Sequence, residues 1–415
     1  MMTDQLFCDI VIEMIENENQ KFAFVLGRER DLCLFELKSV LGLFGFDFGI
    51  ISLTDNAVFI NTTATEKQIA NLAPILGGTI KIFKIISEAG DMEGEMSSYI
   101  ENNLAENGKI TFGLSVFDPE RLNFTLRMAN QVGFEVKRKI KNKGISSRFI
   151  ELREGLQVPN IISLKEKLIE KGVEFGLFTI GLGVMIGMSN PLEWSRRDYD
   201  KPAGDKYSGM LPPKLARMMI NIALSQSNDK MEKTILIDPF CGSGNILLES
   251  MVLGLDFIGS DSSEKAVKDS QSNCEWLRRD IESKLDCRVE VGDATSFDFS
   301  KILDNTKSTI VVTEPYLGEP KKFKPTLNAA RGEYRKVKEL YMSFLNNLQR
   351  IKKADKKIII CMVFPIVETV EGERYSLYQE SVDEMRKIGY SVLVKPLIYG
   401  RDYQVVKRQI ALLSL

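Results

Sequence analysis

Four short apolar runs in the second half of the chain each end in polar residues. They are typical of strands in an α/β fold, because segments with helical spacing of apolar residues lie between them. The carboxyl ends of such strands form the edge at which open α/β sheets bind ligands. One acid at such an end is most often a helix cap or a solvated loop residue, but four polar ends in order favour a nucleoside cofactor site. The runs are 234–237, 256–259, 287–291 and 308–312, and the ends are Asp238, Ser260-Asp261, Gly292-Asp293-Ala294 and Thr313-Glu314-Pro315-Tyr316.

The first of these ends carries the most specific motif, DPFCGSGNILLE, which runs from Asp238 to Glu249. Gly242 and Gly244 permit unusual backbone conformations and let a ligand approach the amides at the start of a helix. The spacing differs from the dinucleotide fingerprint G-x-G-x-x-G, because Leu247 stands at its third glycine, so a nicotinamide or flavin site is disfavoured. Asp261 follows Asp238 at about 20 residues, where an acid at a strand end can bind ribose hydroxyls.

The last part of the chain continues the alternation of helices and strands. Its final two strands can pair antiparallel across the turn 399–402, which is typical of an edge hairpin on a mostly parallel sheet. We expect this hairpin to have only a structural role. The predicted elements are helices over 333–351 and 381–387 and strands over 357–364, 391–397 and 403–413.

The N-terminal part predicts a small α+β domain, because strand-like and helix-like runs alternate at short intervals. Residues 88–108 are polar and acidic, which indicates a linker and a surface helix, and the acidic residues 3–20 resemble an added extension. The expected strands lie over 21–26, 47–53, 57–60 and 79–86, and the expected helices over 32–41 and 67–76.

A strongly basic run follows a predicted strand over 110–117 and a predicted helix over 119–132. Further strands are expected around 149 and over 175–186, with a helix over 162–171 between them. Basic residues along one edge can bind phosphates without regard to sequence, although most such runs are solvated surface. On the residues alone the two interpretations are even. The basic residues are Lys137, Arg138, Lys139, Lys141, Lys143, Arg148 and Arg153, with Glu151 among them.

Composition restricts the function without naming it. The 415 residues are enough for two or three domains, and 44% hydrophobic with 27% charged residues is ordinary for a globular protein. The net charge of −2 means that any nucleic-acid site must be local. We expect a cytoplasmic protein without membrane partner, because the chain shows no apolar run of about 18 residues and no basic, signal-like start.

The six cysteines and the missing histidine restrict the chemistry further. The cysteines lack C-x-x-C spacing, so we expect neither a disulfide framework nor a zinc site. The absence of histidine excludes Ser-His-Asp and Cys-His catalysis and every histidine-bound metal. Reactions that need positioning, hydrogen bonds and a low-dielectric pocket, rather than a general base near neutral pKa, remain possible.

Several motifs together resemble one family, the S-adenosylmethionine-dependent tRNA guanosine-N2 methyltransferases that carry an N-terminal THUMP domain. They are SRRDYDKP (195–202), GMLPPKLARMMINIA (209–223), DPFCGSGNILLE (238–249), GSDSSEKA (259–266), GDA (292–294) and TEPYLG (313–318). The resemblance implies a class I, Rossmann-like, seven-stranded sheet over residues 191–415. It also implies a ferredoxin-like domain over 1–90 and a THUMP-like RNA-binding domain over 91–190. The implied activity is methylation of the N2 amine of a guanosine in tRNA, at position ten.

The resemblance also assigns residues to the cofactor. Asp261 would hold the ribose, Asp293 and Ala294 would border the adenine, and the GMLPP segment would cover the methionine end. The residues expected to bind S-adenosylmethionine are Leu211, Asp238, Phe240, Cys241, Gly242, Gly244, Asn245, Asp261, Ser262, Asp293 and Ala294.

The catalytic residues are expected to be Thr313, Glu314, Pro315 and Tyr316. In amino-methyltransferases this motif reads Asp/Asn-Pro-Pro-Tyr/Phe. Its first side chain and the next carbonyl accept hydrogen bonds from the target amine, and its aromatic ring stacks on the base. Pro315 restricts Glu314 to an extended conformation. Here Thr and Glu replace the first two residues, so a charge-balancing role falls to Glu314 if its side chain turns into the pocket.

Two basic clusters near the motif are further candidates. Arg196 and Arg197 are expected to bind RNA. They lie in a connector with several prolines, which predicts no regular structure before the helix at 215–223. The second cluster follows the TEPYLG turn and consists of Lys321, Lys322 and Lys324. A loop that clamps the substrate and an ordinary exposed loop are equally consistent with these residues.

Three functions stay open at this point. The first is tRNA guanosine-N2 methylation, the second is N6-adenine methylation of DNA by a related motif, and the third is RNA binding by a relative that has lost activity. tRNA is the expected partner, without metal, and a small activating protein partner is unknown.

Overall fold

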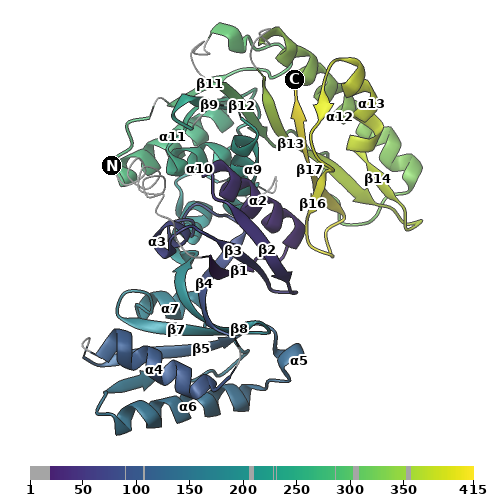
Figure 1. Ribbon diagram of the computed structural model, residues 1–415. Coiled ribbons are helices and arrows are strands. Elements are labelled where there is room, and N and C mark those ends of the chain that lie inside the picture. Colours follow the sequence, from purple (N-terminus) through teal and green to yellow (C-terminus); the bar gives the residue numbers. More distant parts are fainter. Residues whose placement is uncertain are drawn as a thin grey trace. The chain divides into compact units, whose positions relative to one another are not determined.

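The computed structural model describes residues 19–415 except 89, 106–107, 205–209, 228, 230, 286, 302–307 and 352–356. Residues 3–18 of the extension predicted over 3–20 therefore lie outside the described residues, and Gln20 already belongs to the first strand. The chain forms two compact units. The described part of the N-terminal unit is 19–30 and 44–193, and that of the C-terminal unit is 31–43 and 194–415. Helix α2 (Arg30–Leu43) belongs almost wholly to the C-terminal unit although strands of the other unit precede and follow it (Figure 1).

One eight-stranded sheet runs through the whole N-terminal unit, in the order β2-β3-β1-β4-β8-β7-β5-β6. Antiparallel pairing of β4 with β8 joins the first four strands to the last four. Because one sheet spans this unit, a boundary at residue 90 stays a prediction. The strands are β1 (Gln20–Leu26), β2 (Phe48–Leu53), β3 (Ala57–Thr62), β4 (Thr79–Ser87), β5 (Ile110–Val116), β6 (Ser147–Phe149), β7 (Gly172–Phe178) and β8 (Gly181–Met188).

Among the described residues of this unit, five helices accompany the sheet, and two of them correct the sequence analysis. The helix expected over 119–132 is two helices, because Asn123 takes a left-handed conformation (φ 50°) and the Thr125 hydroxyl caps a new helix by accepting from Met128 N. The first part of the basic run, Lys137 to Lys141, therefore lies on α6, whereas Lys143, Arg148 and Arg153 follow this helix. The helices are α3 (Glu66–Ala70), α4 (Met92–Leu104), α5 (Pro119–Leu122), α6 (Leu126–Asn142) and α7 (Asn160–Lys165).

The core of the N-terminal unit contains a buried ion pair as well as apolar packing. The rings of Phe117 and Phe178 stack at 4.8 Å. Lys81 Nζ on β4 lies 2.5 Å from Glu174 Oε1 on β7, and both side chains are essentially inaccessible to water. The hydroxyls of Ser115 and Ser163 donate to the two oxygens of the same carboxylate, each over 2.6 Å. These bonds satisfy a charge whose burial alone is costly.

The C-terminal unit is a mainly parallel sheet with helices on both faces. Seven strands follow the path β11-β10-β9-β12-β13-β17-β15, and β14 and β16 pair beside it. Helices α9, α10 and α11 cover one face and α12 and α13 the other (Figure 1). The strands are β9 (Thr234–Asp238), β10 (Asp256–Asp261), β11 (Cys287–Val291), β12 (Ser308–Thr313), β13 (Ile359–Glu368), β14 (Arg374–Ser376), β15 (Ser391–Val392), β16 (Leu397–Tyr399) and β17 (Val406–Ser414).

The boundaries of the helices in this unit follow local capping. Helix α12 begins six residues earlier than predicted, because the Thr326 hydroxyl accepts a hydrogen bond from Ala329 N over 3.2 Å. The connector also differs from prediction, since it contains α8 (Pro191–Ser195) and a π-helical turn over Arg196–Asp200. The other helices are α9 (Pro213–Ser225), α10 (Asn245–Leu253), α11 (Glu264–Ile281), α12 (Leu327–Leu348) and α13 (Leu377–Lys387).

The predicted C-terminal hairpin is present in altered form. The strand expected over 391–397 is two short strands, β15 and β16, and both pair antiparallel with β17. β17 also pairs along nine residues with β13, so it lies inside the sheet and not at its edge. This position carries side chains of β17 to the neighbourhood of the predicted active site.

Candidate active site

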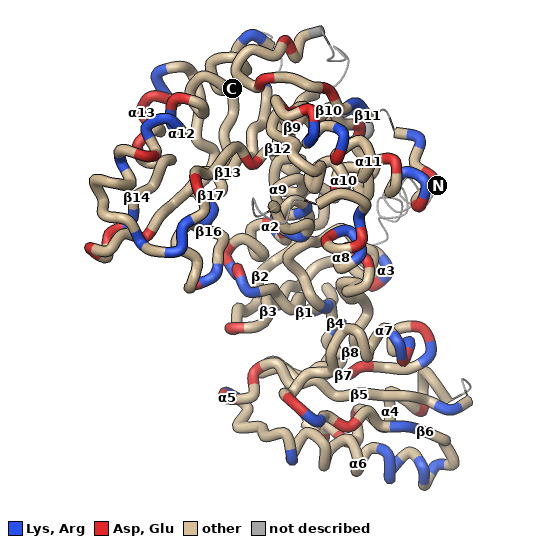
Figure 2. The backbone as a smooth tube through the Cα atoms, turned by 180° about the vertical axis from the view of Figure 1, so that it is seen from behind, with Lys and Arg blue, Asp and Glu red and all other residues tan. Residues whose placement is uncertain are grey.

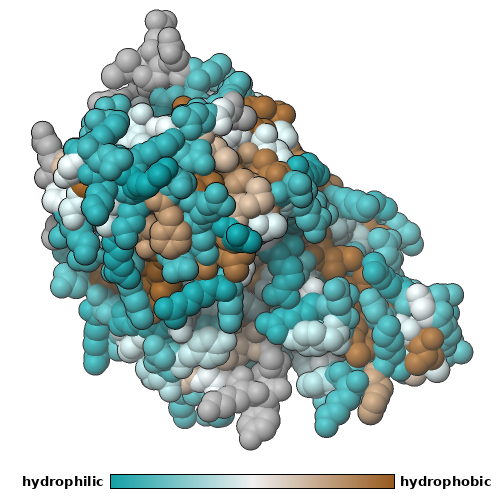
Figure 3. Space-filling model, turned by 90° about the horizontal axis from the view of Figure 1, so that it is seen from below, coloured by the Kyte–Doolittle hydropathy of each residue, from teal (hydrophilic) through white to brown (hydrophobic). Residues whose placement is uncertain are grey.

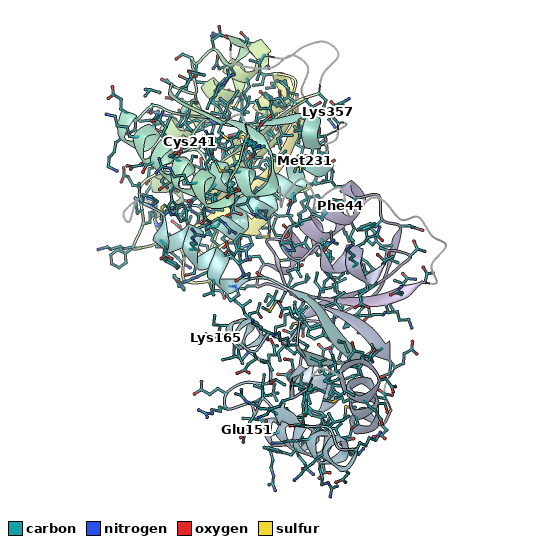
Figure 4. The ribbon with its side chains drawn as sticks, turned by 90° about the vertical axis from the view of Figure 1, so that its left-hand side faces the viewer. Phe44, Glu151, Lys165, Met231, Cys241 and Lys357 are labelled. Atoms are coloured by element: carbon teal, nitrogen blue, oxygen red, sulfur yellow. The ribbon has the colours of Figure 1, made fainter. Side chains whose placement is uncertain are left out.

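The glycine turn has the geometry that its sequence predicts. Gly242 (φ 52°) and Gly244 (φ 86°) are left-handed, and Gly244 is the N-cap of α10. A Cβ on Gly244 would overlap Ser270 Oγ, whereas one on Gly242 would meet open space. Cys241, directly before Gly242, is buried, and burial raises the pKa of its thiol well above the ordinary value, so it is no nucleophile. Figure 4 labels Cys241 within the helices and strands of the C-terminal unit.

Asp261 ends β10 beside this turn. Its carboxylate accepts hydrogen bonds from Gly242 N over 3.0 Å and from Ser263 N over 2.9 Å. The residue is half-buried and the neighbouring Ser262 is exposed. A carboxylate has about four lone-pair sites, so two backbone bonds leave it able to accept from ligand hydroxyls.

Asp293 lies two residues after the end of β11, the next strand in the sheet. It is exposed, and its Oδ1 accepts from Thr295 N over 2.9 Å and from the Thr295 hydroxyl over 2.8 Å. Ala294 is buried, and its carbonyl accepts from Asn347 Nδ2 over 2.9 Å. The polar ends of neighbouring strands β9, β10 and β11 therefore lie along one edge, as predicted.

Asp238, at the end of β9, is buried rather than open to a ligand. It is 1% exposed and accepts from the Thr313 hydroxyl over 2.6 Å and from Phe240 N over 3.3 Å. Burial raises the pKa of Asp238 to about 7, the two hydrogen bonds lower it, and the charges of Asp261 and Glu314 raise it further. The bond joins β9 to its parallel neighbour β12, which ends at Thr313.

Phe240 and Thr313 have mainly structural surroundings. The Phe240 ring packs edge-on against Phe344 of α12 at 5.2 Å. Thr313 is fully buried and its hydroxyl proton is directed to Asp238. Thr313 thus fixes the strand end from which the next residues project.

Glu314 forms an ion pair that the sequence did not indicate. Arg408 Nε on β17 donates to Glu314 Oε1 over 2.5 Å and Arg408 Nη2 to Oε2 over 3.3 Å. The two side chains are 14% and 13% exposed. Burial raises the pKa of the Glu314 carboxyl, and the guanidinium of Arg408 opposes this shift. The carboxylate therefore has a fixed position and a counter-charge.

Tyr316 is the exposed aromatic residue of the motif. It is 50% exposed, and its hydroxyl donates to Glu319 Oε1 over 2.8 Å. Its carbonyl accepts from the hydroxyl of the buried Tyr341 over 3.3 Å, and Pro315 before it is buried. The backbone of the turn is held from below while the ring faces outward.

The connector is hydrogen-bonded to the glycine turn. Asn245 Nδ2 donates to the carbonyl of Leu211 over 2.6 Å, and Lys201 Nζ contacts Asn245 Oδ1. The buried Asn273 of α11 donates to the carbonyls of Ala203 and Ser243, both over 2.8 Å. Leu211 and Asn245 thus lie beside the turn, where the sequence analysis placed them.

The structure corrects the prediction that Arg197 binds RNA. It is buried, and its Nε donates to Glu249 Oε1 over 2.6 Å. Arg217 Nη2 donates to the other oxygen of the same carboxylate over 2.5 Å. The Trp194 ring lies 4.7 Å from the Arg197 guanidinium and 5.3 Å from that of Arg217. A guanidinium in such a cluster is not available to phosphate, so Arg197 has a structural role.

The other predicted RNA-binding residues lie on surfaces. Arg196 pairs with Asp280 and stacks on Trp276 at 5.2 Å. Figure 2 shows the basic positions along α6. Most of the predicted basic residues of the N-terminal unit have acidic neighbours in exposed ion pairs, which are weak and exchangeable. The pairs are Arg138–Glu135, Lys139–Asp91, Lys143–Glu101 and Arg148–Glu166, while Lys137 and Lys141 are the remaining predicted residues of the helix.

The loop after Tyr316 carries two anchored lysines and an exposed aromatic residue. Lys321 pairs with Glu333 over 2.5 Å and Lys324 with Glu368 over 3.0 Å. Phe323 between them is 84% exposed. The lysine cluster is therefore partly neutralised, which leaves the choice between a substrate clamp and a plain loop open.

Two features are absent from the described residues. Within the part of the chain that the structure covers, no group of three or more Cys, Asp or Glu side chains could hold a metal ion. In the same part, none of the helices combines the length and the apolar character needed to cross a membrane.

Comparisons with known proteins show which methyltransferases this chain is similar to. A family model described as a DNA methylase matches residues 177–272. The tRNA (guanine(10)-N2)-dimethyltransferase of Methanothermobacter thermautotrophicus is 28% identical over 174 residues, which are 41% of this chain and 44% of that protein. The protein of the same name from Methanocaldococcus jannaschii is 32% identical over 161 residues, which are 37% of this chain and 41% of that protein.

Over about two fifths of its length, the chain is similar in sequence to tRNA (guanine(10)-N2)-dimethyltransferases. The resemblance drawn from the sequence motifs is thus confirmed, although the matches span less than half the length of these two relatives. The crystal structure of TrmN from Thermus thermophilus superposes with a TM-score of 0.51 at 15% identity, over 95% of this chain and 99% of that one. This similarity confirms the predicted class I methyltransferase fold.

Proposed function

We propose that this protein transfers a methyl group from S-adenosylmethionine to the exocyclic N2 amine of a guanosine in tRNA, at position ten. The observation that carries the proposal is the TEPY turn at the end of β12, directly beside the glycine turn that ends β9. A cofactor turn and an amine-binding motif on neighbouring parallel strands are what amine methylation needs. The names of the two tRNA methyltransferase relatives supply the substrate.

The residues at the strand ends fit S-adenosylmethionine. The open space above Gly242 gives a ligand access to the backbone of the turn. Asp261 would accept from the ribose hydroxyls, and Asp293 and Ala294 would border the adenine. When bound, the cofactor supplies a methyl group on a sulfonium. The other residues of the predicted cofactor set lie in the connector, in or beside the glycine turn, and directly after Asp261. They are Leu211, Asp238, Phe240, Cys241, Gly244, Asn245 and Ser262.

The chain's own residues position the target amine. Tyr316 would stack on the base, and the Glu314 carbonyl, whose direction Pro315 restricts, would accept from the amine. Thr313 fixes the start of this turn through its bond to Asp238. Its hydroxyl proton is already used there, so the role that the family gives to the first motif residue shifts toward Glu314. No metal ion is needed for this chemistry.

The N-terminal unit would bind the tRNA. Helix α6 offers Lys137, Arg138 and Lys141 on one side, while Val136 and Ile140 pack into the core. The surface seen in Figure 3 is mostly hydrophilic, with hydrophobic side chains in smaller areas. A polar, locally basic surface suits a phosphate backbone. Its assignment as a THUMP-like domain over 91–190, after a ferredoxin-like domain over 1–90, and a cytoplasmic location are part of the same proposal.

The second candidate, N6-adenine methylation of DNA, has one observation in its favour. The family model that matches residues 177–272 is described as a DNA methylase. This match includes the glycine turn and Asp261 and ends before the TEPY turn, so it does not reach the residues expected to contact the base. The relatives named as tRNA methyltransferases therefore favour guanosine in tRNA over adenine in DNA.

The test compares two substrates in one assay. Purified protein with labelled S-adenosylmethionine is offered unmodified bulk tRNA or duplex DNA, and methyl transfer to each is counted. We expect transfer to tRNA only. Transfer to DNA would support the second candidate, and cofactor and tRNA binding without any transfer would indicate an RNA-binding relative that has lost activity.

A further inference from the structure

The pairing of Glu314 with Arg408 has no counterpart in the family motif, which has proline at the position of Glu314. The pair is bidentate, with contacts of 2.5 Å and 3.3 Å, and its side chains are only 14% and 13% exposed. Removing two charges from water is costly, and apolar residues of similar size often stabilise a fold as well or better. Stability therefore does not explain why this turn has a carboxylate and a guanidinium.

The position of the pair relates it to the target base. Glu314 lies two residues before Tyr316, the exposed ring expected to stack on that base. Arg408 comes from β17, where it is opposite Pro365 of β13 and Tyr399 of β16. Two elements far apart in sequence thus place a carboxylate and a guanidinium at the turn that carries this aromatic residue.

The chemistry of the pair matches one edge of guanine. Guanine presents N1–H and N2–H as adjacent donors and O6 as an acceptor, whereas adenine presents an N1 acceptor beside its amine. A carboxylate has about four lone-pair sites and a guanidinium five N–H donors, so each can hydrogen-bond a base while it holds the other. A carboxylate facing adenine would meet the N1 lone pair and be repelled.

We propose that Glu314 and Arg408 form a specificity-determining pair that recognises guanine, with Glu314 accepting from N1–H and N2–H and Arg408 donating to O6. Arg408 also acts as a positioning residue, because it fixes the Glu314 carboxylate. This inference rests on the proposed function and names how its substrate base is selected.

The test uses binding, so that it does not depend on turnover. Two tRNAs carry inosine or adenosine at position ten; inosine retains N1–H and O6 but has no N2 amine to methylate. We expect the wild-type protein to bind the inosine form at least about tenfold more tightly. Glu314→Gln should remove most of this preference, because an amide can turn its NH₂ toward N1 of adenine. Arg408→Lys should reduce it in part, since it retains charge without the fork.

A matched control is Lys407→Gln, which breaks the Lys407–Glu368 pair on the same strand and should leave the preference unchanged. The preference is a ratio within one variant, so partial unfolding does not imitate its loss. Equal inosine preference in wild type and Glu314→Gln would overturn the inference. The guanosine activity of the wild-type protein, assayed in parallel, reports on the proposed function independently.

Discussion

At the scale of single residues, the candidate site contains two kinds of side chain. Some are exposed and open to a ligand, and others are buried and fix the backbone of the site. Tyr316 and Asp293 are exposed, whereas Asp238 and Thr313 are buried against each other. The TEPY motif therefore has an exposed ring, which we propose stacks on the base, and a buried threonine that fixes the strand end. These two parts respond differently to substitution.

Tyr316→Ala should reduce kcat/KM for tRNA by about 10- to 100-fold, because stacking of a base on an aromatic ring contributes about 1–3 kcal/mol. Cofactor affinity should stay the same. Tyr316→Phe keeps the ring and loses only the exposed bond to Glu319, so it should retain most of the activity. Steady-state kinetics with a parallel cofactor-binding titration measure this. Equal loss in the Phe and Ala variants would contradict stacking.

Asp238→Asn should make stability less dependent on pH. The pKa of Asp238 in the folded state, about 7, lies above the ordinary 3.8, so its contribution to stability is complete below about pH 4 and is lost as pH rises through 7. Asparagine retains the oxygen that accepts from Thr313 and Phe240 and stays neutral. Relative to wild type, the variant should gain up to about 4 kcal/mol between pH 4 and pH 8.

Thermal unfolding of both proteins at pH 5 and pH 8 tests this expectation. The difference between the proteins isolates residue 238, since all other titrating groups are common to both. A wild-type-minus-variant difference that is the same at the two pH values would show that Asp238 titrates normally.

At the scale of elements, buried charges hold the connector against the helices. Glu249 of α10 binds Arg197 of the connector and Arg217 of α9, and all three are buried. The cluster joins elements that flank the glycine turn. The connector's helical form, which the sequence analysis missed, agrees with this inward-facing arginine.

Glu249→Ala should lower the free energy of unfolding of the C-terminal unit by about 3–5 kcal/mol, because it leaves two buried arginines without their shared counter-charge. The control is Glu275→Ala on α11, which removes an exposed pair with Arg279 and should cost less than about 1 kcal/mol. Urea denaturation followed by tryptophan fluorescence compares the variants. Similar midpoints for both would mean that the buried cluster adds no stability.

The basic side of α6 predicts a charge effect on tRNA binding. Lys137→Glu with Lys141→Glu should weaken binding and flatten the dependence of log affinity on log salt concentration by about two units, if both residues contact phosphate. A control that reverses the same number of charges is Lys265→Glu with Lys268→Glu on α11. Salt titrations of tRNA affinity distinguish them. An unchanged slope in the α6 variant would assign this side of the helix to plain solvated surface.

At the scale of the whole molecule, the sequence predicted more of the fold than of the candidate site. The order of strands and the glycine turn followed from apolar runs and glycine spacing, because both are local properties. Arg408 did not, since it meets Glu314 across 94 residues through antiparallel pairing of β17 with β13. Arg197 was assigned to RNA because an arginine that faces a buried acid has the same sequence signature as one that faces solvent.

Methyl transfer to a single tRNA transcript, followed by mass spectrometry of its nucleosides, tests the central claim most directly. The account predicts N2-methylated guanosine in a transcript with guanosine at position ten, and none when that residue is adenosine. Methyladenosine, or N2-methylguanosine that persists after the substitution, would contradict it.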